Sequence, residues 1–208
     1  MQITDTIFVL VIVIFSAIIH EVMHGVMADW LGDHTARYAG RLTLNPLVHL
    51  DPMGSVVIPL FLALSGSPIF FAYAKPVPYN PYNLRPGRFS EALVAFAGPA
   101  SNAVIAVLFG LSIRAGIFTS TINSTLFLVV VVNVMLCIFN LIPIPPLDGS
   151  KILTALLPSR LAYEWAKVRT ALESNPIMGM IIVVFVVYSL GSVFTTLIYG
   201  VASVIAGT

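Results

Sequence analysis

Long apolar stretches separated by short polar connections dominate this chain. Four of them approach the roughly 20 residues that a helix needs to cross a bilayer, and they cover about residues 3–28, 89–113, 126–142 and 177–205. A fifth stretch, 53–71, is apolar enough but is interrupted by prolines and a glycine. Such interruptions favour a re-entrant or broken helix packed within the protein. The pattern predicts an all-α polytopic membrane protein with about four transmembrane helices plus one re-entrant or broken helix.

The connecting segments predict smaller features. Residues 36–44 alternate apolar and polar side chains, as a short strand does. Five prolines in residues 68–86 exclude a helix there and favour an extended or edge-strand segment at the membrane interface. Residues 160–173 predict an amphipathic helix, either interfacial or a solvated connector. We expect a single membrane-embedded domain over residues 1–208, with a core of about 3–157 and a C-terminal part, an amphipathic segment and the last span, over about 158–208.

The positive charges indicate an orientation. If 53–71 returns to the side from which it starts, nine of the ten Lys and Arg residues fall on one side and only Arg114 lies opposite. Lys and Arg near span ends favour the cytoplasmic side. We therefore expect both termini on the non-cytoplasmic side.

The composition excludes several classes of protein. Hydrophobic residues make up 58% of the chain and charged residues 9%, whereas a soluble domain carries about a quarter charged residues. The net charge of +1 offers no electrostatic footprint for nucleic acid, so we expect none as a partner. Cys137, the lone cysteine, cannot form an internal disulfide and is most simply a small core residue. The N-terminus lacks the basic region of a cleavable signal peptide.

The first apolar stretch contains ionisable residues, which are costly within a membrane and so indicate function. His20-Glu21-Val22-Met23-His24 has the pattern H-E-x-x-H. A spacing of four residues places both imidazoles on one face of a helix, where a single Zn²⁺ can reach them. Glu21 lies beside the pair and is the candidate general base.

A catalytic zinc site takes three protein ligands. Asp148 is the candidate third ligand, because it follows an apolar span directly, after prolines that unwind the helix. Asp148 lies at the same depth as the histidines only if the number of crossings between the two segments is even. The re-entrant reading of 53–71 satisfies this condition. Asp51 is the reserve candidate. Alternatively, Asp148 is the N-cap of a short helix over 150–157.

Taken together, the motifs resemble those of the site-2 protease family of intramembrane zinc metalloproteases, in order from about residue 20 to 149. The segments that carry this resemblance are H-E-x-x-H at 20–24, G-P-A-S-N at 98–102 and N-L-I-P-I-P-P-L-D-G at 140–149. Residues 45–54 and 74–78 are similar to segments of the compact branch that lacks a PDZ domain.

The resemblance implies an enzyme, a zinc-dependent metalloendopeptidase that cuts a transmembrane protein or peptide substrate within or near an unwound segment, as in regulated intramembrane proteolysis. It implies Zn²⁺ at His20, His24 and Asp148, with Glu21 as the catalytic acid and base. Asn140 either contacts the substrate backbone or forms an interhelical hydrogen bond, and we favour a structural role for Asn102. The expected location is a prokaryotic cell membrane, multi-pass in the lipid bilayer, with the zinc site nearer the cytoplasmic face. Oligomeric state is not indicated.

The remaining polar residues have simpler interpretations. We expect His49 to be a hydrogen-bond partner of a metal ligand or part of a turn, His34 to lie in an exposed loop, and Arg114 and Lys151 to reach lipid headgroups. Two rival functions are weaker. A metal transporter needs several sites along a route across the membrane, and a pseudoprotease usually lacks a ligand or the base.

Overall fold

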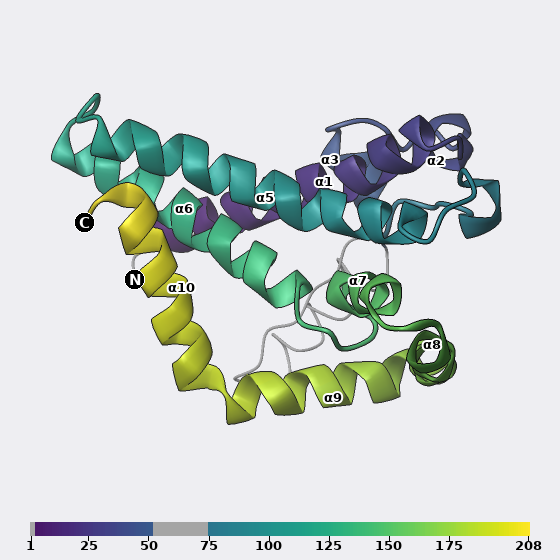
Figure 1. Cartoon of the computed structure of the whole chain (residues 1–208). Coiled ribbons are helices and arrows are strands. Elements are labelled where there is room, and N and C mark those ends of the chain that lie inside the picture. Colours follow the sequence, from purple (N-terminus) through teal and green to yellow (C-terminus); the bar gives the residue numbers. More distant parts are fainter. Residues whose placement is uncertain (1–2, 52–74) are drawn as a thin grey trace.

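The computed structural model describes residues 3–51 and 75–208, and these residues form helices and turns without a β-strand (Figure 1). The chain is therefore an all-α polytopic membrane protein, as predicted. The predicted re-entrant segment 53–71 lies outside the described residues.

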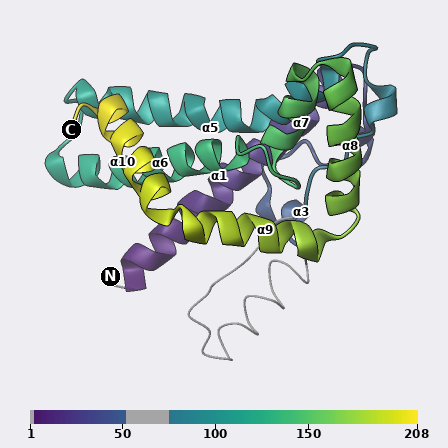
Figure 2. The ribbon, with the colours of Figure 1, turned by 60° about the horizontal axis from the view of Figure 1, so that its bottom comes forward.

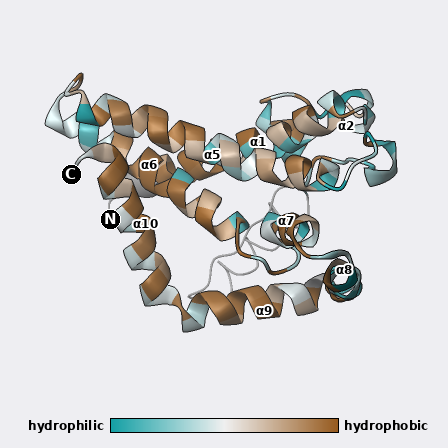
Figure 3. Ribbon diagram, viewed as in Figure 1, coloured by the Kyte–Doolittle hydropathy of each residue, from teal (hydrophilic) through white to brown (hydrophobic). Residues whose placement is uncertain are grey.

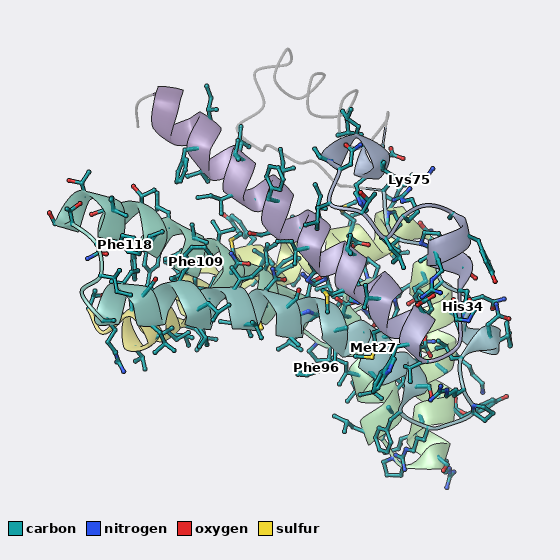
Figure 4. The ribbon with its side chains drawn as sticks, turned by 90° about the horizontal axis from the view of Figure 1, so that it is seen from above. Met27, His34, Lys75, Phe96, Phe109 and Phe118 are labelled. Carbon is teal, nitrogen blue, oxygen red and sulfur yellow. The ribbon has the colours of Figure 1, made fainter. Side chains whose placement is uncertain are left out.

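Within residues 3–51 and 75–208, three helices are long and apolar enough to cross a membrane: α1 (Ile3–Trp30), α5 (Ser90–Arg114) and α6 (Ser120–Asn140). A fourth span results if the bent pair α8 and α9 is counted as one. Seen from above, α1 crosses α5 at an angle (Figure 4). Large apolar side chains such as Phe96 and Phe109 on α5 are exposed, and the long helices are hydrophobic over most of their length (Figure 3). These surfaces suit contact with lipid tails.

The last predicted span, 177–205, consists of two helices, α9 (Pro176–Ser189) and α10 (Gly191–Ala206), separated at Leu190. Ser189 and Gly191 flank the break, and Gly/Ser pairs are a known cause of kinks. As Figure 2 shows, α9 runs back from α8, and α10 then turns towards the end where both termini lie. Helix α10 packs against α5 and α6 in a core cluster that consists of Ala106, Ile113, Val130, Val134, Ala202 and Ala206.

Two further helices lie at the opposite end, α7 (Asp148–Leu156) and α8 (Ser159–Glu173). The predicted amphipathic helix over 160–173 is thus a helix. Its Trp165 Nε1 donates a hydrogen bond to the carbonyl of Ser150 at 3.0 Å, and Arg169 lies 3.0 Å from Glu91. One face of α8 therefore packs on α7 and α5, while Leu161 and Tyr163 are exposed.

The predicted strand over 36–44 is wrong. Residues Thr35–Tyr38 form a single helical turn, α2, and a second short helix, α3, covers Pro46–His49. The reason is local: the Asp33 carboxylate accepts hydrogen bonds from the Thr35 N–H and hydroxyl, which starts a turn. The Arg41 N–H then closes onto the carbonyl of Ala36.

Residues 75–85, which we name the strap, follow the prediction only partly. Its first residues are non-helical, as the proline content predicts, and Pro81–Asn83 forms a 3-10 turn, η2. No edge strand is present in the described part of the predicted segment 68–86. The strap crosses the end of α1 and places backbone groups, rather than a sheet edge, beside the functional residues.

Candidate metal centre

Two imidazoles meet on one face of α1. His20 and His24 are both buried, and their Nε2 atoms lie 3.0 Å apart. The four-residue spacing places them one above the other on the helix. Helix α5 approaches the two rings closely at Gly98, because a Cβ built on this residue would lie 2.5 Å from each Nε2. Only glycine at this position leaves room for both rings.

The opposite nitrogen of each ring is held by α5. His20 Nδ1 donates to Asn102 Oδ1 at 2.6 Å, and His24 Nδ1 donates to the carbonyl of Val94 at 2.7 Å. A carboxamide or carbonyl oxygen can only accept, so the proton of each neutral ring lies on Nδ1. Both Nε2 atoms therefore present lone pairs to the same point, as metal-binding histidines do.

Asp148 completes a triangle with the two histidines. Its Oδ2 lies 3.1 Å from His20 Nε2 and 3.2 Å from His24 Nε2. The alternative role as N-cap is not observed, because Asp148 is the first residue of α7 and Leu147 occupies the cap position. The next residue, Gly149, lies against the carbonyl of Leu141, where a Cβ would clash. The glycine lets α7 begin close to the end of α6 and directs the Asp148 carboxylate inward.

These three atoms fit a zinc ion. Zinc bonds of about 2.0–2.2 Å in a tetrahedron separate ligand atoms by roughly 3.3–3.5 Å, close to the observed 3.0–3.2 Å. Without a cation, two lone pairs and a carboxylate oxygen would repel one another in a buried place. The donor set, two imidazoles and a carboxylate, is one that catalytic zinc uses.

Glu21 lies beside this triangle and has a separate partner. One of its carboxylate oxygens and one ring nitrogen from each of the two histidines all lie within 4.8 Å of one another. Its Oε2 accepts a hydrogen bond from the Val77 N–H at 2.9 Å. Asp148 rather than Glu21 supplies the oxygen at contact distance from both imidazoles. The hydrogen bond that orients Glu21 therefore comes from the strap, whereas His20, His24 and Asp148 contact one another.

The strap itself is fixed at several points. The buried Arg41 guanidinium donates to the carbonyls of Lys75 and Pro76, at 2.7 and 3.3 Å, immediately before Val77. The Lys75 N–H bonds to the carbonyl of His49 at 2.9 Å. Further along, the buried Asp33 accepts from the Asn80 N–H at 2.6 Å. Because the strap is held on both sides of Val77, the Val77 N–H has a defined position next to Glu21.

A cavity of about 180 Å³ opens at these groups. Asn140 lines it, and the hydrogen bond that its Nδ2 donates goes to the Leu136 carbonyl within α6, at 2.9 Å. Tyr79 and Lys151 also line the cavity. Lys151 was expected to extend to headgroups, but instead its ammonium lies 5.3 Å from the centre of the Tyr79 ring.

The other polar residues fall into place around the site. Asp51, the reserve ligand, is not among the residues that line the cavity. His49 is the buried last residue of α3, and its Nε2 donates to the Thr43 carbonyl at 2.8 Å. His34 lies at the surface and pairs with Asp29 at 2.7 Å. Arg114 donates to the carbonyl of Val204 at 2.8 Å, next to the C-terminal end of α10.

Sequence reasoning missed several supporting residues. Asn102 Nδ2 donates to Asn133 Oδ1 at 2.9 Å, and Asn133 Nδ2 donates to Ser16 Oγ at 3.0 Å, which joins α5, α6 and α1. Asn133 could have been found, since it is a polar residue in the middle of an apolar span. Val94 and Val77 act through backbone atoms, and no side-chain pattern indicates them.

A multi-pass helical membrane protein in which two imidazoles and two carboxylates meet in one buried cavity has the make-up of a membrane metallopeptidase. Comparison with known proteins agrees. The family model of Peptidase family M50 matches residues 111–185, a range that includes Asn140 and Asp148 but not the histidines.

Curated relatives extend the match. The chain is 34% identical over 161 residues to "Putative zinc metalloprotease YwhC" of Bacillus subtilis, with 73% of this chain and 69% of the relative covered. It is 36% identical over 152 residues to "Putative zinc metalloprotease Rip2" of Mycolicibacterium smegmatis, with 69% of this chain covered, and it spans 55% of that relative's length. No solved structure matches it. The chain belongs to peptidase family M50, the site-2 proteases, and is a zinc-dependent peptidase.

Proposed function

We propose that this peptidase hydrolyses a peptide bond within or near an unwound transmembrane segment of a membrane-protein substrate, as in regulated intramembrane proteolysis. The main support is the convergence of His20 Nε2, His24 Nε2 and Asp148 Oδ2 within 3.0–3.2 Å in a buried cavity. These atoms come from a membrane-spanning helix and the short helix that follows another. In the described part of the chain, the one group of three or more His, Cys, Asp or Glu residues that could hold a metal ion is His20, Glu21 and His24, whereas transport of a metal requires several such groups along a route.

In this proposal His20, His24 and Asp148 hold Zn²⁺, which when bound supplies a Lewis acid that acidifies water and polarises a carbonyl. Glu21 accepts a proton from the attacking water and returns it to the nitrogen of the leaving amine. The Val77 N–H holds Oε2 of this carboxylate, so Oε1 is the oxygen that exchanges the proton. Asn102 and the Val94 carbonyl keep both imidazoles in the tautomer that binds metal.

The substrate must be extended before it is cut, because the peptide groups of a helix are already paired with one another. The cavity of about 180 Å³ is too small for a whole helix. Asn140 is the proposed contact for the substrate backbone. Its Nδ2 is engaged by Leu136, so its carboxamide oxygen would accept a substrate N–H.

The proposed orientation places the site nearer the cytoplasmic face. Arg114 lies at the end of α5 where α10 also ends and both termini lie (Figure 1). His34 and Lys75 lie at the other end, and Phe118 marks the end near Arg114 (Figure 4). An excess of Lys and Arg at one end favours the cytoplasm for that end. In a prokaryote this would be the cell membrane.

The zinc content of the detergent-purified protein, measured by elemental mass spectrometry, tests the ligand set. We expect one zinc per chain in the wild type and in Glu21→Gln, and its loss in His20→Ala and Asp148→Ala. Full retention of zinc in Asp148→Ala would remove Asp148 from the ligand set.

Cleavage of a fluorescein-labelled unstructured protein, β-casein, and of a membrane-spanning peptide in detergent micelles tests the substrate class. Glu21→Gln should keep zinc and abolish turnover of both, since the proton acceptor is lost. Cleavage of casein with no cleavage of the membrane-spanning peptide would support a peptidase but contradict the intramembrane substrate. Retained turnover in Glu21→Gln would contradict the assigned base.

A further inference from the structure

Tyr79 and Lys151 form a pair on the wall of the cavity that holds the candidate metal ligands. Both residues line this cavity together with His20, Glu21 and Asp148. Tyr79 comes from the strap, two residues after the N–H that holds Glu21, and Lys151 comes from α7, three residues after Asp148. A spacing of three on a helix places Lys151 on the same face as Asp148. The pair therefore faces the region where the peptide bond would be cut.

The Lys151 ammonium lies 5.3 Å from the centre of the Tyr79 ring, within the range of a cation–π contact. Lys151 is the one lysine or arginine among the described residues that line this cavity. A cation in a partly buried site is costly unless an anion or a polarised group compensates it. A contact with an aromatic ring compensates it only in part, which leaves the ammonium available to a stronger acceptor.

The reaction supplies that acceptor. When Glu21 takes a proton from the attacking water, its negative charge passes to the former carbonyl oxygen of the peptide. Preorganised donors at that oxygen are a main source of catalysis, and Lys151 is the cation in the described lining of the cavity that can meet the displaced charge.

Tyr79 suits the same role. Its hydroxyl belongs to a half-buried side chain that packs beside the Ala28, Leu31, Leu84 and Val94 cluster. Burial raises the pKa of Tyr79 above its ordinary value, so the phenol keeps its proton at neutral pH. A protonated phenol and an ammonium are both donors, and neither competes with Glu21 for the proton of water.

We propose that Tyr79 and Lys151 bind the carbonyl oxygen of the scissile peptide and stabilise the negative charge that develops on it. This rests on the proposed function, in which Glu21 activates water at the same cavity. It assigns two substrate-binding residues, one on the strap and one on α7, three residues after Asp148.

The test compares this pair with a matched pair elsewhere. Lys167 lies 4.3 Å from the ring centre of Tyr163 on the exposed face of α8, away from the cavity. Five variants of the full chain in detergent are needed, namely Tyr79→Phe, Lys151→Met, Lys151→Arg, Tyr163→Phe and Lys167→Met. For each we would measure zinc per chain, kcat and KM on fluorescein-labelled β-casein, and the affinity of a phosphinic peptide, whose tetrahedral anionic group imitates the transition state.

We expect Tyr79→Phe and Lys151→Met to retain zinc, to lower kcat by on the order of 10²-fold with little change in KM, and to weaken the phosphinic peptide by a similar factor. Lys151→Arg should recover part of both losses because it restores the cation. Tyr163→Phe and Lys167→Met should behave as the wild type.

Two results would overturn the proposal. One is a kcat and a phosphinic-peptide affinity within twofold of wild type in both cavity variants. The other is loss of zinc in these variants, which would make the pair a support for Asp148 rather than a substrate contact. A wild type that binds zinc but does not cut casein would count against the proposed function, while binding of the phosphinic peptide would still decide the role of the pair.

Discussion

The metal side and the base side of this site are built differently. On the metal side, α1 and α7 supply the proposed ligand side chains, and Asn102 of α5 holds His20 within a buried network that includes Asn133 and Ser16. On the base side, Glu21 also comes from α1, but its orientation is set by the strap, whose backbone N–H at Val77 reaches its carboxylate. The strap is in turn held by Arg41 and Asp33.

This difference separates two properties of the enzyme. The metal side consists of packed helices, namely the spans α1, α5 and α6 with the short helix α7, so it should be rigid and should govern whether zinc binds. The base side depends on a non-helical segment at the end of the bundle, so it can be disturbed without loss of the metal. Variants of the first kind should lose zinc and activity together, and variants of the second kind should lose activity alone.

The largest effect should follow Gly98→Ala. The added Cβ would lie 2.5 Å from both Nε2 atoms, so the rings must move away from their shared point. A displacement of about 1 Å at a reacting centre costs roughly 10²-fold in rate, and we expect zinc to be lost as well. Gly200→Ala is the control, because nothing lies within 4 Å of its added Cβ. Zinc content and cleavage rate near wild type in Gly98→Ala would show that the close approach of α5 is not required.

Asn102→Leu should come next. Removal of the Oδ1 acceptor frees His20 Nδ1 and leaves the ring without a fixed tautomer. Loss of such a partner typically weakens metal affinity by roughly 10- to 100-fold, which a zinc competition titration would measure. Asn133→Leu disturbs the same buried network without touching His20. If it weakened zinc as much as Asn102→Leu does, the effect would belong to helix packing instead.

Arg41→Gln tests the base side. The loss of the guanidinium that holds the Lys75 and Pro76 carbonyls should let the Val77 N–H move from Glu21. We expect kcat to fall about tenfold, part of the contribution of a general base, with one zinc still bound and KM little changed. Arg41→Lys should recover some of the loss. Arg37→Gln, at an exposed arginine on α2, is the control, and loss of zinc in Arg41→Gln would contradict the separation of the two sides.

The smallest effect concerns the far end of the strap and depends on pH. Burial by itself raises the pKa of Asp33, but hydrogen bonds from Thr35, Asn80 and Asn83 outweigh it and hold the pKa below the ordinary value of 3.8. Because the folded pKa is lowered, the stabilisation is complete above pH about 4 and is lost as the pH falls through the folded value. Asp33→Asn should therefore cost about 1–3 kcal/mol of unfolding free energy at neutral pH.

Thermal unfolding in detergent at neutral and acidic pH checks this. The difference in midpoint between the wild type and Asp33→Asn should be largest at pH 7 and should shrink below pH 4. A difference that stays constant over this range would show that the charge of Asp33 does not contribute.

Much of the metal side could be predicted from the sequence because its signals are local. Helical periodicity places His20 and His24 on one face, and the prolines before Asp148 are visible in the sequence itself. The first three spans lie within a few residues of their predicted bounds, apart from the earlier start of α6. The supporting residues were harder to find. Asn102 was expected to be structural, and its contact with His20 depends on how α5 crosses α1.

Most of the base side could not be predicted from the sequence, because its contacts also depend on how distant segments pack. A backbone donor such as Val77 N–H has no sequence signature, and Arg41 lies 34 residues from the carbonyl of Lys75 that it binds. The strand predicted over 36–44 failed because the hydrogen bonds that the Asp33 carboxylate accepts from Thr35 start a turn and outweigh a short alternation of apolar and polar residues. Likewise, the placement of Lys151 at a cavity rather than at headgroups depends on the packing of α7.

The sequence by itself determined that this is a helical membrane protein, that two histidines share one helical face, and that Asp148 follows a span, because apolar length and helical periodicity are properties of contiguous residues. Only the tertiary structure decided that Asp148 Oδ2 meets both Nε2 atoms, that each Nδ1 is held by α5, and that Glu21 is oriented by the strap. Those contacts join residues as far as 128 positions apart, and hydrogen-bond distances across such separations depend on how the helices pack.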